Sequence, residues 1–150
     1  MSNVSTIEEF TGYEELPEGL VKTLHPKIFF GFLSKPQDEK HVKALEKINS
    51  NSIDLLVCNL YPFDEIKDKK LKIEELTHYW DIGGPSMIMA AIKGNHTCVL
   101  TDPNQYEEFL DNLSDSGTIS MNYIKKINKK ALNYVVHYHK MIETYFEENY

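Results

Sequence analysis

The strongest hydrophobic pattern in the chain lies near its C-terminus. Apolar residues recur there at three- and four-residue intervals, at Ile124, Ile127, Ala131, Val135, Tyr138, Ile142 and Tyr145. This spacing places them on one face of a helix, with polar residues on the opposite face. The pattern therefore predicts a long amphipathic C-terminal helix.

Two nearly continuous apolar runs, Ile53–Leu60 and Thr97–Thr101, predict short strands. Runs without polar alternation are typical of strands that are buried on both faces in a parallel sheet. A third strand is expected over Val4–Phe10, before the turn residues Thr11 and Gly12. Three strands are few for a sheet of this kind.

Helical patterns separate these runs. Helices are expected over Gln37–Asn49, Lys70–Tyr79, Pro85–Lys93 and Asp102–Leu113. The segment Leu20–Leu33 has no clear period, and we interpret it as an irregular loop. Strands that alternate with helices indicate an α/β domain with a mainly parallel sheet flanked by helices, and 150 residues fit one such domain over 1–150.

The composition is that of a globular protein, with 41% hydrophobic and 26% charged residues. No apolar run approaches the roughly 20 residues that span a bilayer, and the N-terminus has no signal-peptide pattern. We therefore expect no association with a membrane and a location in the cytoplasm. The net charge of −7 argues against nucleic acid as a partner.

The basic residues are all lysine, because the chain has no arginine. A phosphate would therefore be held by lysine, hydroxyls or backbone amides, without a bidentate guanidinium. Cys58 and Cys98 lie in apolar runs, which favours two core thiols over a disulfide. His137 and His139 point in different directions on the expected helix, and no spacing of Cys and His residues fits a zinc site. We therefore expect no metal, and we expect no cofactor.

Polar residues follow the first buried strand, at the sheet edge where ligands bind in parallel α/β domains. Asn59 and Tyr61 would lie at that edge. The segment Asp81-Ile82-Gly83-Gly84-Pro85 precedes a helix, whose free N–H groups and dipole favour an anion. A helix cap with a tight turn explains the same residues and is the simpler interpretation of this segment alone.

A second cluster combines cations, a hydroxyl and an imidazole within Lys22–Lys27. Such a cluster can bind an anion and supply a proton, although a solvated basic turn is an equally good interpretation. Lys93 ends an apolar helix, where a lysine commonly interacts with the helix C-terminus.

In combination, these segments resemble one family. They are Glu9–Glu15, Val21–Ile28, Ile53–Phe63, Asp81–Ile88 with Ala90 and Ala91, and Asp102-Pro103 followed by Tyr106. The motifs Lys-Thr-Leu-His-Pro, Asn-Leu-Tyr-Pro-Phe and Asp-Ile-Gly-Gly-Pro occur in the order and spacing of the IMP cyclohydrolase domain of the bifunctional AICAR formyltransferase/IMP cyclohydrolase. The resemblance implies a methylglyoxal-synthase-like fold.

The resemblance also implies a reaction, the dehydrative closure of formyl-AICAR to IMP in purine biosynthesis, without a metal or redox cofactor. Lys22 and Tyr61 would stabilise the formyl oxygen, Asp81 would hold and polarise the carboxamide, and Lys93 would help the oxygen leave as water. The substrate would be positioned by Thr23, Asn59, Gly83 and Gly84.

The chain departs from the family pattern where a phosphate would be held. Leu20 and Met89 stand where the family has arginine, Phe29 and Phe30 replace His-Gly, and Gly94 is an apparent insertion. The resemblance further implies an N-terminally truncated domain, without the family's phosphate loop and two strands. A homo-oligomer or a complementing chain is then expected to complete the sheet.

Two functional interpretations follow. The first is an IMP cyclohydrolase unit that binds the purine nucleotides formyl-AICAR and IMP. The second is a non-catalytic relative that binds purine nucleotide or acts in assembly, its pocket partly filled by the apolar side chains Leu20, Phe29, Phe30 and Met89.

Overall fold

The computed structural model describes residues 4–66, 71–113 and 117–149. Its α-helices and strands, in chain order, are α1 (Ile7–Thr11), α2 (Pro26–Leu33), α3 (Glu39–Lys47), β1 (Leu55–Val57), α4 (Ile73–Leu76), α5 (Gly83–Gly94), β2 (Cys98–Leu100), α6 (Tyr106–Asn112) and α7 (Met121–Asn149). Short 3-10 helices cover Pro17–Gly19, Phe63–Glu65, Thr77–Tyr79 and Pro103–Gln105.

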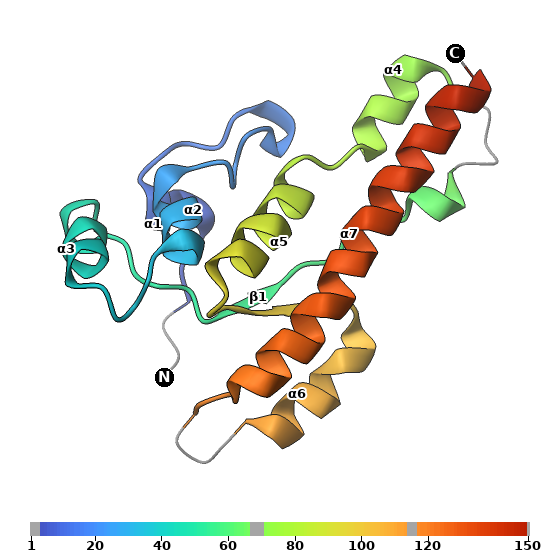
Figure 1. Cartoon of the computed structure of the whole chain (residues 1–150). Coiled ribbons are helices and arrows are strands. Elements are labelled where there is room, and N and C mark those ends of the chain that lie inside the picture. The colour runs from blue at the N-terminus through green and yellow to red at the C-terminus, as the bar shows by residue number, and fades with distance from the viewer. Residues whose placement is uncertain (1–3, 67–70, 114–116, 150) are drawn as a thin grey trace.

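The described strands form one parallel pair. Leu55, Leu56 and Val57 lie opposite Cys98, Val99 and Leu100. The chain crosses from β1 to β2 through α5, which lies between α2 and α7 on one side of the strands (Figure 1). The predicted α/β fold with parallel strands and a long C-terminal helix is confirmed.

Helix α7 runs along the whole molecule (Figure 1) and packs against β2 and α5. All seven apolar positions that predicted it are buried. Within the described part of the chain, no helix is both long and apolar enough to cross a membrane.

One buried polar side chain on α7 closes the outer edge of β2. Asn128 Oδ1 accepts the Val99 N–H at 3.0 Å, and Asn128 Nδ2 donates to the Thr97 carbonyl at 2.9 Å. The amide thus satisfies a donor and an acceptor that a further strand would otherwise pair with. This explains an asparagine in the apolar stripe of α7.

The expected strand Val4–Phe10 is wrong, because these residues lead into helix α1. Thr6 and Glu9 form a capping box, in which each side chain accepts the backbone N–H of the other residue. Gly12 ends the helix in the left-handed conformation, with φ of 73°. This local capping outweighs the short apolar run.

The expected irregular loop Leu20–Leu33 is wrong in its second half, which is helix α2. His25 caps this helix by accepting the Lys27 N–H at 3.2 Å, and Pro26 occupies its first turn. The helix expected over Pro85–Lys93 is confirmed as the slightly longer α5, and the other expected helices and strands are confirmed with shorter limits, although Lys70 lies outside the described residues.

The prediction that β1 is buried on both faces is also wrong. Leu56 lies in the core, but Leu55 and Val57 on the other face are 39% and 49% exposed. The N-terminal half of α7 covers Cys98 and Leu100 on that face of β2 and does not extend over β1. The Leu55 and Val57 backbone groups also face away from β2, so the described sheet has an open edge.

We predict that Asn128→Ala lowers the free energy of unfolding by about 2 to 4 kcal/mol, because two buried backbone groups lose their partner. Asn133→Ala, on the exposed face of α7, is the matched control. It should change the free energy of unfolding by less than about 0.5 kcal/mol. Urea denaturation measures both, and equal midpoints for the two variants would contradict this role of Asn128.

Candidate functional site

The carboxyl ends of β1 and β2 lie together, and the chain leaves β1 through Asn59 and Tyr61. Asn59 Nδ2 donates to the Thr101 carbonyl at 3.0 Å, which joins the segments after the two strands. Leu60 is buried, and its N–H donates to the Tyr134 hydroxyl of α7 at 3.1 Å. The course of the chain into Tyr61 is therefore fixed by buried contacts.

A cleft of about 540 Å³ opens beside this edge, and we call it the central cleft. Three separate segments line it: the chain before α2, the chain after β1, and the N-terminus of α5. Of the residues singled out in the sequence, it brings together Lys22, Thr23, Tyr61, Asp81, Gly83 and Gly84.

Asp81 is held at the start of α5 by its backbone and its side chain. Its N–H donates to the Tyr138 hydroxyl at 2.8 Å, and its Oδ1 accepts the Gly84 N–H at 2.9 Å. A carboxylate has further lone pairs on both oxygens. Asp81 can therefore cap the helix and still accept a hydrogen bond from a ligand in the cleft.

The two glycines at this helix start are required by close approach. A Cβ on Gly83 would lie 2.7 Å from Thr23 Oγ1, and one on Gly84 would lie 2.7 Å from Leu60 Cδ2 and would also overlap the Asp81 carboxylate. The Gly-Gly pair therefore lets the segments that carry Thr23, Leu60 and Asp81 converge.

Lys22 lies between the central cleft and a second, smaller cavity of about 210 Å³. Its ammonium group pairs with the Glu15 carboxylate at 2.8 Å, and both side chains are 40% exposed. The preceding residue, Val21, has φ of 63°, a left-handed conformation that is strained for a β-branched residue. Such strain is common in segments that carry function.

Tyr61 is 55% exposed at the rim of the cleft, so its phenol is free to meet a ligand from solvent. Two other expected site residues do not line the cleft. The Asn59 amide is directed to Thr101, and Lys93 lies ten positions after Gly83 on α5, about 15 Å along the axis at 1.5 Å per residue.

Among the residues that line the cleft, Cys58, His78 and Trp80 were not predicted from the sequence as site residues. Trp80 is 36% exposed, and its ring packs on Phe146 of α7 with centroids 5.3 Å apart. Each lies within three residues of a selected position, and that adjacency is the signal that could have found them.

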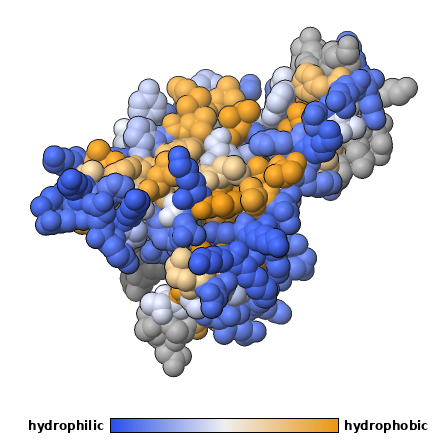
Figure 2. Space-filling view, viewed as in Figure 1, coloured by the Kyte–Doolittle hydropathy of each residue, from blue (hydrophilic) through white to orange (hydrophobic). Residues whose placement is uncertain are grey.

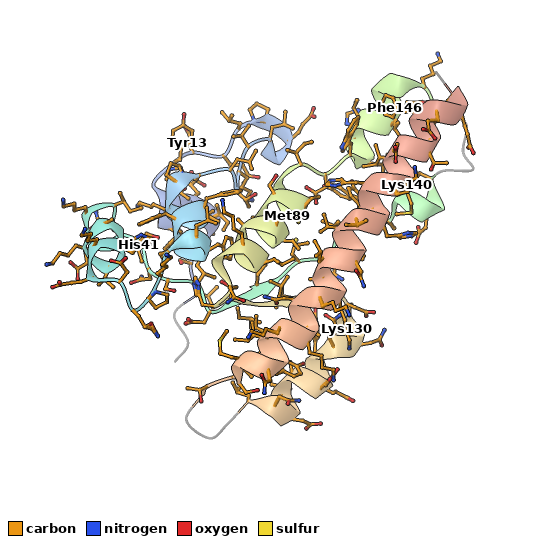
Figure 3. All side chains as sticks on the ribbon, viewed as in Figure 1. Tyr13, His41, Met89, Lys130, Lys140 and Phe146 are labelled. Atoms are coloured by element: carbon orange, nitrogen blue, oxygen red, sulfur yellow. The ribbon has the colours of Figure 1, made fainter. Side chains whose placement is uncertain are left out.

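Among the apolar replacements, only Leu20 lines the central cleft. Met89, labelled on α5 in Figure 3, borders a shallow neighbouring hollow together with Asp81 and His139. Phe29 and Phe30 belong to α2 instead: Phe29 packs against the core, and Phe30 lies beside His41 with ring centroids 5.6 Å apart. The expected filling of the pocket by all four side chains is therefore wrong.

The cleft combines groups that suit a planar, polar ligand. An ammonium group and a phenol can donate to a developing oxyanion, a carboxylate can accept N–H groups, and Trp80 adds an aromatic residue to the lining. Figure 2 shows hydrophobic residues gathered on the middle of the face where α2 and α5 lie, with hydrophilic residues over α3 and α6. Over the described residues, no three His, Cys, Asp or Glu side chains gather as metal ligands.

Two protein-family models match successive parts of the chain. Residues 3–86 match the MGS-like domain, and residues 90–150 match the AICARFT/IMPCHase bienzyme. The first match contains Lys22, Tyr61, Asp81 and the glycine pair, and the second contains the C-terminal end of α5 and all of α7.

Similar curated proteins are bifunctional purine biosynthesis proteins PurH. The protein of Clostridium botulinum strain Langeland is 38% identical over 149 residues, which is 98% of this chain and 30% of that protein. The protein of Prochlorococcus marinus strain MIT 9211 is 42% identical over 137 residues, 90% of this chain and 26% of that protein. The chain thus spans less than a third of these relatives.

A solved structure supports the fold. The crystal structure of ForH superposes with a TM-score of 0.78 at 25% sequence identity, over 95% of this chain and 75% of that chain.

We predict a slow, strongly pH-dependent reaction of Cys58 with a thiol reagent such as DTNB. Burial, and secondly the Asp81 carboxylate, raises the pKa of the Cys58 thiol to about 11. Because only the thiolate reacts, the rate should rise about tenfold per pH unit between pH 7 and 10. Cys58→Ser isolates the contribution of the more deeply buried Cys98. A Cys58 rate that levels off below pH 9 would contradict this environment.

Proposed function

Because the chain belongs to the family of MGS-like domains, we propose that its central cleft binds a purine nucleotide and catalyses the IMP cyclohydrolase reaction of purine biosynthesis. The observation that carries this proposal is the convergence of Lys22, Tyr61 and Asp81 from distant segments on one cleft. The PurH relatives support a role in purine biosynthesis. We expect the reaction to take place in the cytoplasm.

In the proposed reaction, the carboxamide nitrogen of formyl-AICAR bonds to the formyl carbon, and the bond from that carbon to the formyl oxygen breaks. The oxygen leaves as water with one proton from the carboxamide nitrogen and one from the formamido nitrogen. The reacting groups belong to one molecule, so the protein must hold them in a compact arrangement. Asp81 accepts an N–H of the carboxamide and orients its nitrogen. Lys22 and Tyr61 donate to the formyl oxygen, where negative charge develops.

The Glu15 ion pair does not prevent Lys22 from taking this role. Both side chains are partly exposed, and exposed ion pairs contribute only about 0 to 1 kcal/mol to stability. An anionic or developing oxyanion group in the cleft can therefore compete for the Lys22 ammonium. Thr23, Gly83 and Gly84 border the same space and would position the base and ribose.

The roles predicted from the sequence for Asn59 and Lys93 have no support from the cleft and stay predictions. Asn59 already donates to Thr101, which leaves its carbonyl oxygen for a ligand. Lys93 lies toward the far end of α5, so its assistance to the departing oxygen requires a reach that the described cleft does not provide. The proposal therefore depends on Lys22, Tyr61 and Asp81.

One observation favours the alternative of a non-catalytic relative that binds nucleotide. Leu20, at the position where the family has arginine, lines the cleft, and the chain has no arginine elsewhere. A phosphate would then depend on Lys22, on hydroxyls and on the α5 N-terminus. Nucleotide binding without turnover is the outcome that this alternative predicts.

We predict that the chain converts formyl-AICAR to IMP and that Asp81→Asn lowers kcat at least about 100-fold, since an amide cannot polarise the carboxamide as a carboxylate does. Asparagine preserves the helix cap, so folding should be retained. Absorbance at the IMP band measures turnover.

The matched control is Asp111→Asn, on the exposed surface of α6, which should retain wild-type activity. Turnover unchanged in Asp81→Asn would contradict the role of Asp81. IMP binding by calorimetry without turnover in the wild type would favour the non-catalytic alternative, and neither binding nor turnover by the folded chain would contradict both.

We further propose that the open edge of β1 pairs with a strand from another chain. That chain is either a second copy of this one or a complementing partner. Leu55 and Val57 expose both apolar surface and unpaired backbone at this edge, and such edges readily accept another strand.

We predict concentration-dependent self-association of the isolated chain in sedimentation velocity. Val57→Lys should weaken it at least about tenfold, because a charge on an edge strand opposes pairing. Val136→Lys, at an exposed position of α7, is the control. A wild-type chain that stays monomeric at all concentrations would contradict pairing with a second copy.

A further inference from the structure

Two tyrosine hydroxyls on α7 hold the backbone of the two segments that carry Tyr61 and Asp81 to the central cleft. The Tyr134 hydroxyl accepts the Leu60 N–H at 3.1 Å, directly before Tyr61. The Tyr138 hydroxyl accepts the Asp81 N–H at 2.8 Å and donates to the Tyr79 carbonyl at 3.2 Å. These contacts join residues that are more than fifty positions apart in the chain.

The spacing of the two tyrosines explains how one helix reaches both segments. Residues four apart lie on the same helix face, about one turn along the axis. Tyr134 and Tyr138 therefore present their hydroxyls in a row, and the Tyr61 and Asp81 segments lie along that row in the same order. The separation of the two segments is thus set by the pitch of α7.

We propose that Tyr134 and Tyr138 are positioning residues, which fix Tyr61 and Asp81 relative to each other across the central cleft. This inference rests on the proposed function, in which those two side chains act on the same substrate. Neither α7 tyrosine lines the cleft, so both act through the backbone that they bind.

The Tyr138 contact fixes more than one residue. Its hydroxyl bonds to the residues on both sides of Trp80, so it also holds the backbone around Trp80, a residue of the cleft lining. Tyr138 is 2% exposed. Burial chiefly raises the pKa of Tyr138; the hydrogen bond from the Asp81 N–H opposes this rise, and the Asp81 carboxylate adds to it. The hydroxyl therefore keeps its proton and remains both donor and acceptor at neutral pH.

The chain offers a matched control on the same helix. Tyr145 is 3% exposed, and its ring packs edge-on against Phe63, as the Tyr138 ring does. Its hydroxyl donates to the Leu71 carbonyl at 2.8 Å, and Leu71 does not line the cleft. Tyr145→Phe therefore removes an equivalent buried hydroxyl without touching either site segment.

The test compares Tyr134→Phe and Tyr138→Phe with Tyr145→Phe in steady-state kinetics with formyl-AICAR. We expect each site variant to lower kcat about tenfold and to change KM less than about threefold, because the ring stays and only the alignment of reacting groups is lost. Tyr145→Phe should change both constants less than about twofold, although it loses one hydrogen bond of the hydroxyl, as Tyr134→Phe does, while Tyr138→Phe loses two.

Amide hydrogen exchange by NMR tests the positioning itself, whether or not the chain turns over substrate. Tyr138→Phe should accelerate exchange at Asp81 and at Gly84, whose N–H depends on the Asp81 carboxylate, at least about fivefold relative to Tyr145→Phe. Tyr134→Phe should accelerate amide hydrogen exchange at Leu60 by a similar factor.

The outcomes separate the two proposals. A wild-type chain without turnover contradicts the proposed function, and the exchange data then decide the positioning role alone. Unchanged exchange at Asp81, Gly84 and Leu60 would overturn that role. So would kcat losses in Tyr145→Phe equal to those of the two site variants.

Discussion

The packing of α7 along the outer edge of β2 is the constraint on which the other parts of the structure depend. Two short parallel strands cannot organise a site alone, because each leaves a row of backbone groups without partners. Asn128 satisfies those groups on β2, and the tyrosine hydroxyls extend the same kind of contact to the segments of Leu60 and Asp81. One helix therefore orders both the sheet and the site.

Much of the fold could be predicted from hydrophobic spacing, because the burial of apolar side chains is the main driving force of folding. The α7 stripe and the β1 and β2 runs show this. Helix α1 could not be predicted in that way, since its five residues are fixed by the Thr6–Glu9 capping box, a local signal that the short apolar run obscured. One face of β1 is exposed because α7 packs on the same face of β2 and does not reach β1. The residues of β1 alone do not reveal how far a distant helix extends.

Only some of the site residues predicted from the sequence reach the cleft in the structure. The family resemblance selected Lys22, Tyr61 and Asp81, and the structure brings these three residues to one cleft, while their roles in a reaction stay a prediction. Lys93 and Asn59 were expected there and do not line it. Helix length sets the distance of Lys93, and a hydrogen bond to Thr101 sets the direction of Asn59. Both are properties of the folded chain.

The central claim is that lysine, phenol and carboxylate groups from distant segments act on one heterocycle. A crystal structure of the chain with IMP tests this most directly. We predict electron density for the base within hydrogen-bond distance of Lys22, Tyr61 and Asp81. Nucleotide bound elsewhere, or these three side chains directed to separate surfaces in the crystal, would contradict it.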